Sequence, residues 1–131
     1  MLVALDHVNI RTSRVEELAS FYVEVLELAR GPRPPFSFAG AWLYCGDRPV
    51  VHLVDAGAGA PAAIDPNDLR LSHFAFRGSD LGNLLARLKH AGVEFRIEQL
   101  PATSVAQVHL RDPDGNALHV DFVSDAPSSP G

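Results

Sequence analysis

The sequence predicts an α+β fold built from two copies of one β-α-β-β-β unit. The first observation is a repeat: residues 5–11 read LDHVNIR and residues 71–77 read LSHFAFR, each with Leu, His and Arg at the same spacing. The second is that each of these strand-like stretches precedes an amphipathic helical pattern. The third is that each half closes with two β-rich runs around a turn. Such internal repetition indicates duplicated supersecondary units.

The first half begins with the strand at 5–11, and a helix follows within residues 12–28. Its apolar residues recur at helical spacing, at Val15, Leu18, Ala19, Tyr22, Val25 and Leu26. This spacing places them on one face, and Ser13 is the expected N-cap. Residues 40–55 then read as two strands around a Gly-Asp turn, and an extended stretch around Pro35–Phe38 is the expected middle strand.

The second half repeats this order. After the strand at 71–77, Leu81, Leu84, Leu85 and Leu88 form one face of a helix, with Ser79 as the expected N-cap and Gly92 as its C-terminal stop. The middle strand is expected around Val93–Ile97. Residues 106–122 form two strands around Asp-Pro-Asp-Gly-Asn, a strong hairpin turn.

These elements divide the chain into a single domain, residues 1–123, made of modules 1–55 and 70–123. Residues 56–69, rich in Ala, Gly and Pro, are the expected linker, and residues 124–131 the expected flexible tail.

Composition narrows the function classes. The chain has 131 residues, 47% of them hydrophobic and 21% charged, as in ordinary globular proteins. A net charge of −5 without a stripe of Lys and Arg argues against nucleic acid as a partner. The apolar runs are too short for a membrane span, and no secretory signal is evident. Cys45 is the only cysteine, which fits a reducing cytoplasm.

Strand alternation places the histidines of both halves on equivalent faces. His7, Asn9 and Arg11 share one face of the first strand, and His73 and Arg77 share the matching face of its repeat. Aligning VHLVD (51–55) with LHVD (118–121) sets His52 against His119, and Asp121 shares the face of His119. We therefore expect four imidazoles, two from each half, at repeat-related positions.

A single half-buried histidine is most often a hydrogen-bonded core residue. Four at equivalent positions are different, because clustered imidazoles repel when protonated and need a cation to bind their lone pairs when neutral. We therefore expect a divalent transition metal ion (Zn, Ni, Co, Fe or Mn) with His7, His52, His73 and His119 as its ligands. His109 lies on the next strand, and its pattern leaves the facing of its side chain open.

The pattern LDHVNIR, FYVEVLEL, SHFAF and LRDPDGNALHVDF resembles the vicinal oxygen chelate superfamily of glyoxalases, bleomycin- and fosfomycin-resistance proteins and extradiol dioxygenases. The resemblance covers residues 3–123. It implies two βαβββ modules forming a curved mixed sheet, a metal held at the four histidine positions, and a homodimer. One departure stands out: most members have a glutamate where this chain has His119, and the second glutamate position holds His52.

The resemblance implies a metal-dependent, glyoxalase-like enzyme, of lyase, isomerase or dioxygenase type, whose small substrate is chelated through adjacent oxygens. Metal-bound water, or Asp121 or His109 acting through a water, is the expected base. Five further side chains are candidates for substrate binding: Asn9, Arg11, Trp42, Tyr44 and Arg77. The alternative is a non-catalytic protein that binds an antibiotic or metabolite, as bleomycin-resistance members do.

Overall fold

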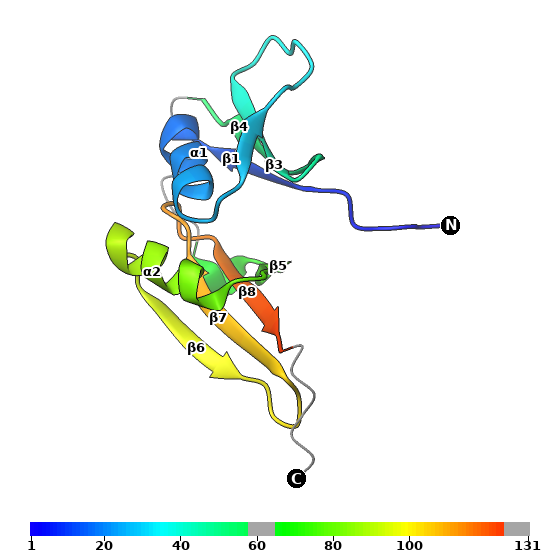
Figure 1. Ribbon diagram of the computed structural model, residues 1–131. Helices are drawn as coiled ribbons and strands as arrows, with labels where there is room; N and C mark the ends of the chain where they lie inside the picture. Colours follow the sequence, from blue (N-terminus) through cyan, green and yellow to red (C-terminus); the bar gives the residue numbers. More distant parts are fainter. Residues whose placement is uncertain (58–64, 125–131) are drawn as a thin grey trace. The chain divides into compact units, whose positions relative to one another are not determined.

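A computed structural model describes residues 1–57 and 65–124 (Figure 1). The chain divides into two compact units, Met1–Ala63 and Ile64–Gly131. Each unit has the element order β-α-β-β-β, so the α+β class and the duplicated unit predicted from the sequence are confirmed. Residues 58–64 of the expected linker, and the expected tail beyond residue 124, lie outside the described residues. Residues Pro66–Asp68 form a short 3-10 helix before the second unit's first strand.

The first unit contains β1 (Val8–Thr12), α1 (Val15–Glu24), β2 (Ala29–Gly31), β3 (Gly40–Cys45) and β4 (Arg48–Asp55). Its sheet has the strand order β1-β4-β3-β2. The β1–β4 pair is parallel and the other two pairs are antiparallel. Helix α1 contacts β2, β3 and β4. The sheet therefore has one face against its helix and leaves the other for the polar residues of β1.

The second unit contains β5 (Phe74–Arg77), α2 (Leu81–Ala91), β6 (Phe95–Gln99), β7 (Val105–Arg111) and β8 (Ala117–Val123). The strand order is β5-β8-β7-β6, again with one parallel pair, β5–β8. The two sheets thus have the same topology.

Strand register confirms the alignment of the two halves. His52 lies opposite Asn9 in the β1–β4 pair, and His119 lies opposite Ala75 in the β5–β8 pair. Asn9 and Ala75 are equivalent positions of the repeat, so His52 and His119 are equivalent too. The two histidines are also nearly equally buried, at 8% and 7% exposure.

The core of each unit is built by the helix and strand faces that the apolar spacing predicts. In the first unit the buried residues include Leu18, Ala19, Tyr22, Leu43, Val51 and Leu53. In the second they include Leu84, Leu88, Val108, Leu110, Leu118 and Val120. No helix in the described residues is long and apolar enough to span a membrane.

Both predicted helix caps are wrong by one residue. Helix α1 begins after Arg14, which makes no side-chain cap hydrogen bond, and the Thr12 hydroxyl accepts from the Arg14 N–H at 3.0 Å instead of Ser13 capping the helix. Helix α2 is capped by Asp80, whose carboxylate accepts from the Asn83 N–H at 3.0 Å; Ser79 lies one residue too early. The predicted stop at Gly92 is confirmed, since it adopts the left-handed conformation at φ 68.

The predicted strand around Pro35–Phe38 is wrong. Proline has no N–H to give to a strand ladder, and residues 32, 34 and 35 are all proline. The middle strand is instead β2, which pairs with β3 so that Gly31 lies opposite Trp42. The second unit's middle strand, β6, overlaps the predicted stretch around Val93–Ile97.

Candidate functional site

Three rings stack in the first unit. His7 and His52 have ring centroids 3.8 Å apart and an interplanar angle of 12°. Trp42 covers the other face of His52, at 4.0 Å and 11°. Trp42 and His52 are register partners on β3 and β4, and His7 directly precedes β1. The imidazole of His52 is therefore held flat between two aromatic rings.

The hydrogen bond of His52 identifies its free nitrogen. Its Nε2 lies 3.0 Å from the Pro49 carbonyl oxygen. A carbonyl only accepts, so Nε2 carries the proton and, in the neutral ring, Nδ1 carries the lone pair. Burial, followed by the neighbouring His7, holds the pKa of His52 below its ordinary value. His52 is thus neutral at neutral pH.

His7 has the opposite arrangement. Its Nδ1 donates to the Asp6 carboxylate at 2.6 Å, which leaves the lone pair of the neutral ring on Nε2. This hydrogen bond is the main reason that the pKa of Asp6 lies below its ordinary value. The pair is partly solvent-exposed, with 37% of the His7 side chain accessible. An acidic residue before the strand thus orients the first of the expected ligands.

Three imidazoles gather in the second unit. The ring centroid of His119 lies 4.8 Å from that of His73 and 4.8 Å from that of His109. His109 and His119 are register partners on β7 and β8. The facing of His109, which the sequence left open, is therefore the face of His119. His73 forms a hydrogen bond with the Ser72 hydroxyl through its Nδ1, at 3.0 Å.

His119 is bound to a carboxylate on its own strand. Its Nδ1 lies 2.5 Å from Oδ1 of Asp121, two residues further along β8. The His119 side chain is 9% exposed and that of Asp121 29%. Because a carboxylate only accepts, Nδ1 is the protonated nitrogen and Nε2 faces outward from the pair.

His109 is surrounded by polar groups of β6 and β7. Its Nε2 donates to the Gln107 side-chain oxygen at 3.1 Å and lies 3.4 Å from a Glu98 carboxylate oxygen. Burial, then the positive charge of Arg96, holds the pKa of His109 below its ordinary value, although Glu98 opposes this shift. The ring is therefore neutral at neutral pH, with its lone pair on Nδ1.

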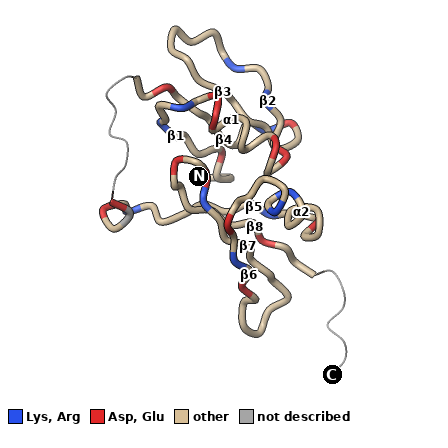
Figure 2. Tube along the Cα trace, turned by 90° about the vertical axis from the view of Figure 1, so that its left-hand side faces the viewer, with Lys and Arg blue, Asp and Glu red and all other residues tan. Residues whose placement is uncertain are grey.

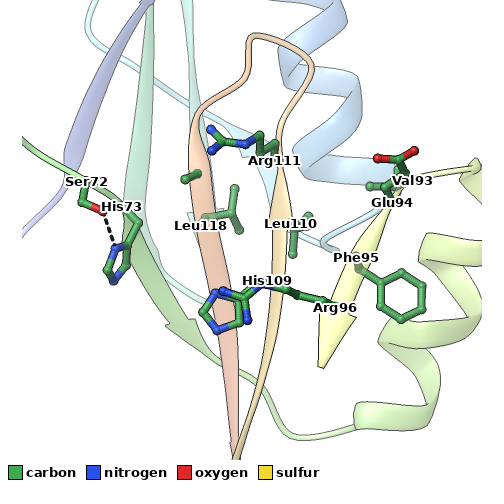
Figure 3. A pocket seen from close by; sticks show the side chains of 11 residues that line it. Ser72, His73, Val93, Glu94, Phe95, Arg96, His109, Leu110, Arg111 and Leu118 are labelled. Atoms are coloured by element: carbon green, nitrogen blue, oxygen red, sulfur yellow. Dashed lines mark hydrogen bonds between the residues drawn. The ribbon is translucent and has the colours of Figure 1, made fainter. Parts of the chain in front are cut away.

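A hollow of about 770 Å³ borders these histidines, and Figure 3 shows the side chains that line it. Arg96 and His109 meet it from β6 and β7, and His73 from the residues before β5. Its remaining lining includes apolar side chains such as Phe95 and Leu118. His119 is not among the lining residues, so the hollow lies next to the His119–Asp121 pair rather than around it.

The other predicted substrate-binding residues lie on the sheets as expected. Asn9 is the β1 partner of His52, and Arg11 follows on the same face, exposed. Arg77 is exposed opposite Asp121 in the β5–β8 register. Within the described part of the chain, none of the three side chains forms a hydrogen bond or an ion pair.

Tyr44 has a structural contact that the sequence did not indicate. Its hydroxyl donates to the Pro32 carbonyl, and its ring covers Gly31 so closely that an added Cβ would lie 2.6 Å from it. The ring therefore fixes the segment after β2.

The sequence analysis did not identify a second aromatic group, which lies beside the stack of His7, His52 and Trp42. The rings of Phe36 and Phe38 stack at 4.8 Å, Phe36 lies 6.5 Å from Trp42, and the Arg33 guanidinium lies over both Phe rings. The prolines that rule out a strand were the available signal for a loop here. Glu98 and Gln107 were also missed. Gln107 lies two residues before His109 on β7, so strand alternation could have indicated it, whereas only the β6–β7 register brings Glu98 close to His109.

Charged residues are mixed over the described chain. Figure 2 shows Lys and Arg interspersed with Asp and Glu along both units.

A sequence comparison with known families identifies one that matches most of the chain. Residues 4–120 match the sequence profile of the Glyoxalase/Bleomycin resistance protein/Dioxygenase superfamily. The chain belongs to this superfamily.

Relatives in the superfamily include two enzymes. Glyoxylase I 4 of Arabidopsis thaliana is 29% identical over 126 residues, which cover 91% of this chain and 70% of that protein. Glutathione transferase FosA of Serratia marcescens is 30% identical over 122 residues, covering 92% and 81%. A glyoxylase/bleomycin resistance protein/dioxygenase domain from Frankia sp. EAN1pec has the same fold, with a TM-score of 0.79, 21% identity and coverage of 95% and 100%.

Superfamily members generally use divalent metals, and the histidines are the candidate ligands in this chain. No group of three or more His, Cys, Asp or Glu within residues 1–57 and 65–124 is arranged to hold a metal ion. Each unit brings two of the predicted ligands together: His7 with His52 in the first, and His73 with His119 in the second. Their donor chemistry, neutral imidazole nitrogen, fits a transition metal.

Proposed function

We propose that this chain is a divalent-metal-dependent, glyoxalase-like enzyme acting on a small substrate with two adjacent oxygens. The observation that carries the proposal is the duplication of a histidine pair: the ring of His7 lies next to that of His52, and the ring of His73 next to that of His119. His52 and His119 occupy equivalent register positions on β4 and β8. A single histidine pair has an ordinary structural explanation, whereas its repetition at the corresponding place in both units favours a ligand set.

The four histidines are the proposed ligands of a Zn, Ni, Co, Fe or Mn ion. When bound, the ion supplies Lewis acidity that polarises the adjacent oxygens of the substrate. Four neutral imidazoles leave its 2+ charge undiminished, whereas the glutamate found in most members would cancel part of it. A weakly basic carbonyl or hydroxyl oxygen is therefore a suitable substrate group.

His109 is the proposed general base. Its Nε2–H is engaged by Gln107, so Nδ1 is the nitrogen available to take a proton, directly or through one water. Its lowered pKa keeps it neutral at neutral pH. Asp121, the other candidate, has one carboxylate oxygen committed to His119.

Substrate binding is assigned to the exposed polar residues of β1 and β5 and the aromatic side chains of β3. Arg11 and Arg77 offer forked donors that match a substrate carboxylate. Asn9, beside His52, orients a polar substrate group, and Trp42 provides an apolar wall, with Tyr44 supporting the same strand. Proton transfer next to a polarised carbonyl, a lyase or isomerase reaction, suits this set. A cytoplasmic location is part of the same proposal.

The test begins with the metal. Purified protein should contain about one transition-metal ion per chain, measured by elemental analysis, and His7→Ala or His119→Ala should each remove it, since each deletes a ligand. His90→Ala, at the exposed end of α2, is the matched control and should retain the ion. Metal-free wild-type protein, purified without chelators and refractory to reloading, would contradict the proposal.

Activity is then screened with the retained metal. Lactoylglutathione tests lyase chemistry, since a lactoylglutathione lyase from Agrobacterium tumefaciens shares the fold with a TM-score of 0.65 at 20% identity. An ortho-diphenol with Fe²⁺ and dioxygen tests ring cleavage, the less favoured reaction because the ligand set lacks a carboxylate.

A second candidate function is non-catalytic binding of an antibiotic or metabolite. The partly apolar hollow beside His73 and His109, with Arg96 at its border, favours it. Saturable binding of a small molecule by both the metal-loaded and the chelator-treated protein, without turnover, would support this function over catalysis.

A further inference from the structure

The buried histidines of the two units differ in one residue. His119 is followed two positions later by Asp121, and His52, its equivalent, by Val54. Side chains two apart on a strand share a face, so only His119 has a carboxylate within reach along its own strand. His52 uses the Pro49 carbonyl instead.

The consequence is that the two equivalent rings carry their protons on different nitrogens. Asp121 accepts from Nδ1 of His119, which leaves Nε2 as the lone-pair nitrogen. Pro49 accepts from Nε2 of His52, which leaves Nδ1. The Nε2 atom of His119 has no hydrogen-bond partner within residues 1–57 and 65–124.

We propose that Asp121 is a positioning residue that fixes the tautomer and ring orientation of His119 and so presents Nε2 to the metal ion. The inference rests on the proposed function for the identity of the ligand, but the tautomer is a property of the metal-free protein. A carboxylate that accepts the second N–H of a ligating histidine also strengthens the donor nitrogen.

Asp121 is itself well fixed. It lies on β8, which has β5 on one side and β7 on the other. Its carbonyl accepts from the Gly78 N–H at 2.9 Å. Gly78 lies against Phe122 and Val120, with only 2.5 Å between an added Cβ and the Phe122 ring. The backbone that carries Asp121 therefore has little freedom to move away from His119.

Two substitutions separate the hydrogen bond from the charge. Asp121→Asn keeps a side-chain oxygen that can accept from Nδ1–H but removes the charge. Asp121→Val removes both and reproduces the residue found after His52. Asp55→Asn, which removes an equal charge from a carboxylate that accepts from the Gly57 N–H, is the matched control.

The first measurement is the tautomer of His119 in metal-free protein, by ¹⁵N NMR of labelled imidazoles. Wild type, Asp121→Asn and Asp55→Asn should show His119 protonated on Nδ1, and Asp121→Val should lose that preference. The second is Zn²⁺ affinity by competition with a chromophoric chelator, which should fall about 10- to 100-fold in Asp121→Val and by less in Asp121→Asn.

A wild-type His119 protonated on Nε2 would overturn the inference, and this holds even if no variant folds. An Asp121→Val protein with the wild-type tautomer and unchanged Zn²⁺ affinity would overturn it as well. Wild-type protein that binds no metal contradicts the proposed function instead, while an Nδ1–H signal that depends on Asp121 would still support the positioning role.

Discussion

At the scale of single residues, the histidines of this chain are distinguished by their partners rather than by their positions. His7 and His119 donate from Nδ1 to a carboxylate, whereas His52 donates from Nε2 to a backbone carbonyl. In the proposed ligand set, the donor nitrogens are therefore mixed and the imidazoles are not equivalent, a difference that residue identity alone does not show.

The buried state of His52 makes stability depend on pH. Its pKa is lowered from 6.5 in the folded protein, so the unfolded chain binds the proton more readily. With respect to His52, the free energy of unfolding should therefore be highest above pH 6.5, and it should decrease as the pH falls below that value. His109 contributes with the same sign.

His52→Phe tests this dependence, since phenylalanine keeps the ring stack with His7 and Trp42 but cannot be protonated. Urea unfolding in the presence of a chelator should show a smaller loss of stability between pH 7.5 and pH 5.5 than in wild type. An equal loss in the two proteins would show that His52 does not contribute.

At the scale of secondary-structure elements, helix starts depend on single hydrogen bonds. Asp80 accepts from the Asn83 N–H, and its charge also lies at the positive end of α2. The serine before it makes no such bond in the described structure. The prediction that Ser79 caps α2 was wrong because Ser and Asp are both good caps and the sequence does not show which adopts extended backbone.

Truncating Asp80 should therefore destabilise the protein, whereas truncating Ser79 should not. Asp80→Ala is expected to lower the free energy of unfolding by about 1 kcal/mol, because the Asn83 N–H loses its acceptor. Ser79→Ala should leave it nearly unchanged. Chemical denaturation of the two variants side by side measures the difference, and an equal effect of both would contradict the assignment of the cap.

At the scale of the whole molecule, apolar side chains are exposed at equivalent places before the first strand of each unit. Leu5 is 80% exposed and Leu71 71%. The residues before Leu5 are apolar and extended, and Figure 1 shows them leaving the sheet of the first unit. Each sheet also has two outer strands. Exposed apolar residues of this kind mark interaction surfaces, and an exposed strand edge can pair with another chain.

We therefore predict a twofold homodimer. Light scattering at micromolar concentration should give twice the chain mass of 14.1 kDa. Leu5→Glu, which places a charge among these residues, should shift the equilibrium towards monomer, whereas Arg87→Gln, on α2, should not. A monomeric wild-type protein would contradict the prediction.

The duplicated topology and the equivalence of the histidines are both predictable from the sequence alone. Both follow from periodicity: alternation assigns strand faces, helical spacing assigns α1 and α2, and turn residues such as those at 112–116 separate β7 from β8. Asp112 shows why that turn is so readable, since its buried carboxylate accepts from the backbone N–H groups of Asp114 and Asn116. These signals depend only on residues close together in the chain, so they can be recognised in a single sequence.

Tertiary structure decided what local signals do not encode. The true middle strand, β2, became visible only through its pairing with β3, and the contacts of Glu98 with His109 only through the β6–β7 register. For His52 and His119 the acceptors are close in sequence, on the same strand, and the folded structure decides only which ring nitrogen each acceptor meets. Residue spacing specifies the face on which a side chain lies, but its partner across the sheet or in the adjoining turn depends on how the whole unit packs.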